Sequence, residues 1–168
     1  LTAVLKKLLA EQVPITDMRT ILEVLAEMSG RNLSITDTAE ALRGYLIPLL
    51  IQRLVPIKEP IPVVTLEPSF ENVMINADRQ NQQEDLIIDG NLSQTLLSKL
   101  SDVVEEQMAL SKTPFLIVSP VIRRKLAKLV RSHIPDLNVL SFTELPETKK
   151  VDVIATISGT NDDQNSEL

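Results

Sequence analysis

Apolar residues recur at helical spacing in the first third of the chain. Two stripes precede residue 30: one of Leu1, Val4, Leu5, Leu8 and Leu9, and one of Ile15, Met18, Ile21, Leu22, Leu25 and Met28. Pro14 ends the first helix, and Thr16 is the expected N-cap of the second. A third helix is expected from about Thr36, with a kink or break before Pro48 because proline lacks an amide donor. Residues 1–55 are therefore predicted to form a helical subdomain.

After the Pro-rich link "VPIKEPIPVV" the apolar period changes, and short strand-like runs alternate with helical ones. Strands are expected at 63–66, 85–89, 114–118, 137–142 and 151–158, and helices at 69–78, 93–110 and 120–131, the second with Leu96, Leu97, Leu100, Val103, Val104 and Met108 inward. This alternation predicts an α/β subdomain at 56–158 with helices packed on a mixed sheet, so the fold class is mixed α/β (α+β). Residues 159–168 are polar and acidic, and we expect them to be disordered.

Composition and charge narrow the classes of function. The chain has 168 residues, 43% of them hydrophobic, only 2% aromatic, and a net charge of -6. A nucleic-acid-stacking surface needs more aromatic faces than this, and a negative molecule repels phosphate backbones. No cysteine is present, and no apolar run approaches the roughly 20 residues of a membrane span. Because the chain opens in helical rhythm without an initiator Met or a signal peptide, we expect a fragment of a longer protein.

Motifs for nucleotides and metals are missing from the sequence. The glycines at 30, 44, 90 and 159 are too scattered for a phosphate loop or a dinucleotide turn. His133 is the only histidine, so multi-histidine metal sites are excluded; its expected role is that of a residue at a helix C-terminus. Asp78, Glu84 and Asp85 lack the spacing of a calcium loop and are interpreted as a flexible acidic loop. We expect no cofactor and no metal.

Ser119 is the one candidate nucleophile, because it follows a strand and precedes a helix. Its neighbours are Val118 and Pro120, where a nucleophile elbow has glycines, and Ser followed by Pro is a common helix start. Capping is therefore the favoured interpretation of Ser119. A stand-alone α/β enzyme that uses Ser119 and a carboxylate remains as an alternative, but no set of residues amounts to an active site.

The stretch "PFLIVSPVIRRKLAKLV" is predicted to be a buried strand followed by a basic amphipathic helix. Its apolar face consists of Ile122, Leu126, Leu129 and Val130, together with His133; Arg124, Lys128 and Arg131 lie nearly opposite, flanked by Arg123 and Lys125. Such a face is commonly just solvated. In a chain of net charge -6, this basic face could also bind an acidic surface of a partner protein, or the acidic face of a neighbouring copy.

The order of four segments resembles a known family. "VLKKLLAEQVPITDMRTILEVLAE", "PVVTLEP", "PFLIVSPVIRRKLAKLV" and "LNVLSFTELPETKKVDVIATIS" are similar to the C-terminal cytoplasmic region of the FlhA/LcrD family. These are export-gate proteins of flagellar and injectisome type III secretion. The similarity extends from Leu1 to about Ser158.

The resemblance implies a protein with membrane helices upstream, in a region absent from this chain, and a cytoplasmic part at the bacterial inner membrane. That part forms a nine-membered ring, receives export substrates and their chaperones, contacts other proteins of the export apparatus, and orders secretion. It implies no enzymatic activity, and it makes exposed residues of 1–55 candidates for the ring contact.

Three hypotheses follow from the sequence. The leading one is a non-enzymatic interaction module of an export gate, with Arg123, Arg124, Lys128 and Arg131 as the partner-binding residues. The second is the Ser119-centred enzyme. The third is a nucleic-acid-binding protein that uses the basic helix, whose affinity would fall steeply with salt.

Overall fold

The computed structural model describes residues 1–160 and divides into two compact units. A helical unit contains Leu1–Glu59 together with Thr143–Lys149, and an α/β unit contains Pro60–Phe142 together with the described residues from Lys150 onward. The segment Thr143–Lys149, which the sequence pattern placed in the α/β subdomain, thus packs with the helices. Most of the expected acidic tail, residues 161–168, lies outside the described part.

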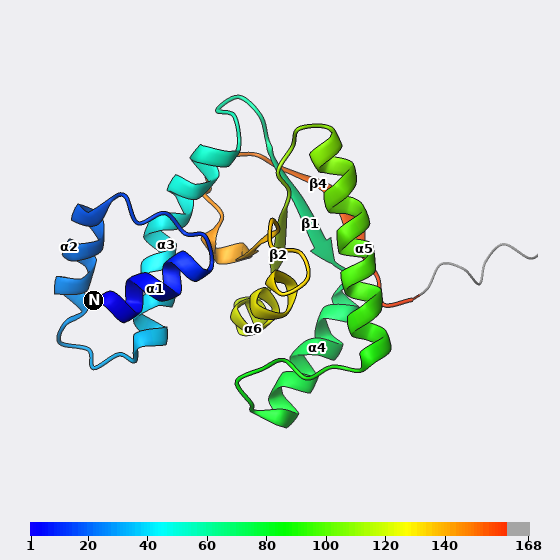
Figure 1. Cartoon of the computed structure of the whole chain (residues 1–168), viewed down its shortest axis with the longest axis horizontal. Coiled ribbons are helices and arrows are strands. Elements are labelled where there is room, and N and C mark those ends of the chain that lie inside the picture. The colour runs from blue at the N-terminus through cyan, green and yellow to red at the C-terminus, as the bar shows by residue number, and fades with distance from the viewer. Residues whose placement is uncertain (161–168) are drawn as a thin grey trace, which may run out of the picture. The chain divides into compact units, whose positions relative to one another are not determined.

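The helical unit consists of α1 (Thr2–Ala10), α2 (Met18–Met28) and α3 (Ile35–Leu54), with α1 and α2 packed on α3 (Figure 1). Its core is aliphatic: Val4, Leu8, Val13, Ile21, Val24, Ala39, Leu42, Leu46, Leu50 and Val55 are buried. Several members of the predicted apolar stripes are instead exposed, namely Leu1, Leu9 and Leu22. The helices were predicted correctly, but their apolar stripes are wider than the buried strip.

The N-cap of α2 differs from the sequence prediction. Asp17, not Thr16, caps α2, because an Asp17 carboxylate oxygen accepts a hydrogen bond from the Thr20 amide at 3.1 Å. The helix α3 begins at Ile35, as expected for a start near Thr36, and the Ser34 hydroxyl accepts a hydrogen bond from the Asp37 amide. In both helices the N-cap side chain accepts a hydrogen bond from the backbone amide three residues further along the chain.

Pro48 does not split α3, so of the kink or break expected before it, the break is absent. The residue four positions earlier, whose carbonyl loses its amide donor, is Gly44, and Gly44 is solvent-exposed. Water can therefore satisfy that carbonyl. Buried Leu46, Ile47 and Leu50 on either side of the proline hold the helix in the core.

The α/β unit is built on a four-stranded sheet of order β3-β2-β1-β4. Its strands are β1 (Ile61–Leu66), β2 (Phe115–Val118), β3 (Asn138–Ser141) and β4 (Val151–Ile157). All three neighbouring pairs are parallel, so the α/β class is confirmed but the sheet is parallel rather than mixed. Parallel strands buried on both faces are continuously apolar, and β2 fits that pattern, whereas β3 is buried throughout but has Asn138 and Ser141 at its ends.

Three helices, α4 (Pro68–Asn81), α5 (Gly90–Ala109) and α6 (Pro120–Arg131), pack with the sheet around one aliphatic core (Figure 1). The expected strand at 85–89 is absent: this segment has no strand pairing, and Asp89 serves as the N-cap of α5 by accepting a hydrogen bond from the Asn91 amide at 2.8 Å. Met108, expected inward, is 54% exposed, whereas its neighbour Gln107 is buried.

The segment Thr143–Lys149 is fixed to the helical unit by two cations. The Arg43 guanidinium donates from Nε to Glu144 at 2.9 Å and from Nη1 to Glu11 at 2.6 Å. Lys149 donates to the Pro56 carbonyl at 2.9 Å. Arg43 is only 3% exposed, so this ion-pair cluster belongs to the interior of the helical unit.

Residues 1–160 contain neither a membrane-spanning helix nor a metal-binding cluster. None of the helices found there combines the length and the apolar character needed to cross a membrane. Within the same residues, no cluster of three or more acidic, histidine or cysteine side chains is arranged to bind a metal ion, and Asp78, Glu84 and Asp85 form no such cluster.

Candidate partner-binding surface

The helix α6 begins where β2 ends, and Ser119 fixes the junction. The Ser119 hydroxyl accepts a hydrogen bond from the Val121 amide at 3.4 Å, and Pro120 occupies the first helical turn. The Ser119 amide donates to a carboxylate oxygen of Glu71 on α4 at 2.6 Å. The expected capping role of Ser119 is thus confirmed.

The single histidine lies just beyond the other end of this helix. His133 is exposed after the C-cap residue Ser132, and its Nδ1 atom is 2.8 Å from the Ser132 hydroxyl and 3.3 Å from the Leu129 carbonyl. Its ring therefore engages the last turn of the helix, as expected for a C-terminal residue. It does not lie on the buried apolar face, because the chain has already left the helix.

Arg123 does not belong to an exposed basic face. Its side chain is 2% exposed and among the largest that are fully buried. At 100° per residue, Arg123 lies only about 20° around the helix from Val130, which is also buried. The angle follows from the sequence alone, and it places Arg123 on the apolar face of the helix rather than beside the basic face.

Acidic residues at seven-residue intervals meet α6 along its length. Glu71 bonds the amide of Ser119, Asp78 near the end of α4 pairs with Lys125, and Asp85, beyond the end of α4, pairs with Lys128. The sequence interpretation of residues 78–85 as a flexible acidic loop missed this pairing, because spacing alone does not reveal which helix lies opposite. The basic helix is therefore partly neutralised from within the same unit.

The two lysine pairs differ in exposure. Both side chains of the Lys125–Asp78 pair are 14% exposed, whereas Lys128 and Asp85 are 59% and 64% exposed. Arg124 is exposed and Arg131 is half-buried. What remains on the surface of α6 is a strip of Val121, Arg124 and Lys128, which spans about 60° of the helix circumference; we call it the α6 strip.

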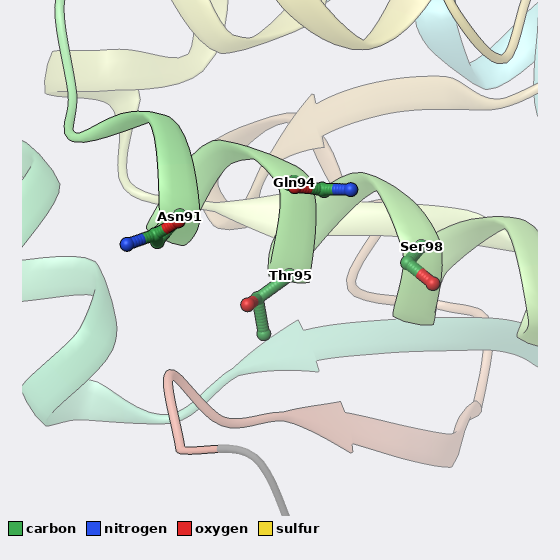
Figure 2. Close-up of a pocket in the computed structure, with 4 residues that line it drawn as sticks. All are labelled: Asn91, Gln94, Thr95 and Ser98. Carbon is green, nitrogen blue, oxygen red and sulfur yellow. The ribbon is translucent and has the colours of Figure 1, made fainter.

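A polar hollow lies elsewhere, along the first half of α5. Figure 2 shows its lining side chains, Asn91, Gln94, Thr95 and Ser98, all projecting from that one helix. These four amide and hydroxyl groups include no ionisable side chain. The hollow can hold polar groups, but its lining supplies neither an acid–base pair nor a nucleophile with a base beside it.

The chain belongs to the FHIPEP family, whose model matches residues 1–150. It is 33% identical over 156 residues to the flagellar biosynthesis protein FlhA of Salmonella typhimurium, a match that covers 93% of this chain and 22% of that protein. It is 28% identical over 158 residues to the invasion protein InvA of the same organism, covering 94% of this chain and 23% of InvA. The resemblance to the C-terminal region of type III export-gate proteins is confirmed.

Solved structures share this fold. The Chlamydia pneumoniae CdsV protein matches with a TM-score of 0.79 and 25% identity over 93% of this chain and 45% of that one. A nonameric SctV-C of EPEC matches with a TM-score of 0.76 and 24% identity over 92% of this chain and 46% of that one. The chain spans about a fifth of the length of the curated relatives and less than half of these solved chains.

Proposed function

We propose that this chain is a part of the cytoplasmic region of a bacterial type III export gate, and that it works by binding proteins rather than by catalysis. The observation that carries the proposal is the family match over residues 1–150, together with the likeness of the fold to CdsV. Ser119, the one candidate nucleophile, serves as the N-cap of α6.

The gate assembles as a ring in this proposal, at the cytoplasmic face of the inner membrane, where it receives chaperone-bound substrates and orders their secretion. Structural relatives described as nonameric support the ring. The helical unit carries exposed apolar side chains suited to self-association, which are Leu9, Leu22, Ile35 and Tyr45. A relative solved in complex with CdsO supports contact with another protein of the export apparatus.

The partner-binding residues in this proposal are Arg124, Lys128 and Arg131 on α6. Arg123 is left out because a buried side chain cannot touch a partner. The support for the other three is their charge in a chain of net charge -6, and Arg124 and Lys128 are also exposed, whereas Arg131 is half-buried. No observation favours the Ser119-centred enzyme or a nucleic-acid-binding role, since Asp78 and Asp85 oppose the cations that phosphates would need.

The test is export by the organism that carries the parent gene. Deletion should stop the secretion of one class of type III substrate, flagellar or injectisome, and the full-length parent gene should restore it. The class that is lost identifies the branch. Normal secretion of both classes after deletion would reject the proposed function.

A further inference from the structure

We infer that the α6 strip of Val121, Arg124 and Lys128 is a docking site for an acidic segment of a partner protein, and that Asp85 occupies the site until the partner replaces it. This inference rests on the proposed function, which it deepens by naming the chemistry of the partner and an intramolecular competitor. It depends on three features of the strip.

The first feature is the combination of an apolar side chain with cations on one side of one helix. Val121 is 55% exposed at the first turn of α6, and Arg124 and Lys128 follow at spacings of three and four residues. A partner helix therefore fits the strip with one apolar contact and with carboxylates one and two turns away. An acidic partner is favoured over a nucleic acid because the flanking carboxylates of Asp78 and Asp85 repel a continuous phosphate backbone.

The second feature is the exchangeable pair on the strip. Lys128 and Asp85 are both more than half exposed, and pairs of this kind contribute little to stability because water and salt screen them. A partner carboxylate can take the place of Asp85 with a loss of no more than about fivefold in affinity. Asp85 lies in the segment between α4 and α5, so it can move away from Lys128 without disturbing a helix.

The third feature is the fixed foundation beneath the strip. Lys125 and Asp78 are nearly buried, Glu71 holds the amide of Ser119, and the Ser119 hydroxyl caps the helix. These contacts hold α6 in place when the outer pair opens. The strip is therefore a preorganised surface, and preorganised sites lose less entropy on binding.

The probe for the test is a fluorescent helical peptide, about 18 residues long, with one central leucine flanked on both sides by glutamates at the third and seventh positions. A twin peptide with glutamines in place of the glutamates reports binding that does not depend on charge. Anisotropy titrations with this chain should give at least about tenfold tighter binding of the acidic peptide at moderate salt. Equal binding of the twins, or no binding of either, overturns the inference.

Variants of the chain show whether the peptide binds at the α6 strip or is attracted only by the overall charge of the chain. Arg124→Glu and Lys128→Glu should each weaken binding of the acidic peptide by about tenfold, whereas Lys112→Glu, an exposed site outside α6, should leave it within about twofold. Val121→Ser should weaken binding, and Val153→Ser, an equally exposed valine on β4, should not. Equal effects at the strip and the control sites contradict a docking site on α6.

The role of Asp85 has its own matched control. Asp85→Asn should tighten binding by up to about fivefold, because it removes the internal competitor. Glu84→Gln makes the same change of charge one residue away, on an exposed side chain outside the pair, and should have a smaller effect. If the two variants behave alike, Asp85 is not a competitor. Failure of these titrations while gene deletion still abolishes export leaves the proposed function standing and removes only this inference.

Discussion

Arg43 in the helical unit and Lys128 in the α/β unit are both cations on helices, but their surroundings give them opposite roles. Arg43 is 3% exposed and bonded to Glu11 and Glu144, whereas Lys128 is 59% exposed and has one exposed partner. A buried charge cannot lose its partner without a large penalty, while an exposed charge exchanges partners freely. Burial therefore distinguishes the cation that holds the fold together from the cation that is available for binding.

The largest expected effect follows from the removal of Arg43. Arg43→Met leaves Glu144, which is 8% exposed, and Glu11, which is 18% exposed, without their common cation. We expect a loss of about 3–5 kcal/mol in the free energy of unfolding, measured by urea denaturation. Arg53→Met, on the exposed side of the same helix, should cost less than about 0.5 kcal/mol. Equal losses in the two variants would show that the cluster does not stabilise the unit.

The next largest effect separates the two lysine pairs of α6. Lys125→Met breaks a hydrogen-bonded pair whose side chains are both 14% exposed, and it should cost about 2 kcal/mol. Lys128→Met breaks the exposed pair and should cost less than about 1 kcal/mol. Denaturation of the two variants side by side checks the order. The reverse order would contradict the assignment of Lys125 as structural and Lys128 as exchangeable.

A smaller, pH-dependent effect is expected at the cap of α2. Hydrogen bonds from the Thr20 hydroxyl and then the Thr20 amide lower the pKa of Asp17 below its ordinary value of 3.8. The ionised cap therefore stabilises the folded chain above that value, and the contribution is lost as the pH falls through the lowered pKa. Asp17→Ala should lower Tm at neutral pH, with the difference shrinking in acid. Asp17→Asn keeps an acceptor for the Thr20 amide, so its Tm at neutral pH should lie much closer to that of the wild type. If Asp17→Ala lowers Tm by the same amount at every pH, the cap does not act through its charge.

The smallest expected change in stability comes from Asp85→Asn. Because its pair with Lys128 is exposed, we expect the free energy of unfolding to stay within about 1 kcal/mol of the wild type. Asp78→Asn makes the same change in the Lys125–Asp78 pair, whose side chains are only 14% exposed, and should destabilise the chain clearly. Denaturation curves of the two variants test the comparison, and a large loss in Asp85→Asn would assign Asp85 to the fold rather than to a docking site.

Local rules predicted much of the fold. Ser119 followed by Pro120 predicted a capped helix start, and apolar runs located β1, β2, β3 and β4. The strand expected at 85–89 failed because a short apolar run does not say whether it pairs, and here Asp89 caps a helix instead. The direction of the strands also depends on which segments become neighbours, and single-sequence patterns do not contain that information.

The candidate surface was harder to predict than the fold. The sequence located the basic helix correctly, and its angular positions could have excluded Arg123, which lies next to Val130. The pairing of Asp78 and Asp85 with the lysines of α6 joins residues more than 40 positions apart, so only the packing of α4 on α6 reveals it. The same limit applies to Glu144, whose partner Arg43 lies in another part of the chain.

The central claim is that the α6 strip binds an acidic partner. The most direct test measures secretion by the full-length parent protein when the charges of Lys128 and Asp85 are reversed. Lys128→Glu alone should reduce secretion. Adding Asp85→Lys rebuilds the ion pair with its charges reversed but leaves a negative side chain on the α6 strip. If the strip docks an acidic partner, the double variant stays as defective as Lys128→Glu while folding normally. Full recovery of secretion in the double variant would show that only the internal pair matters, and would contradict the account.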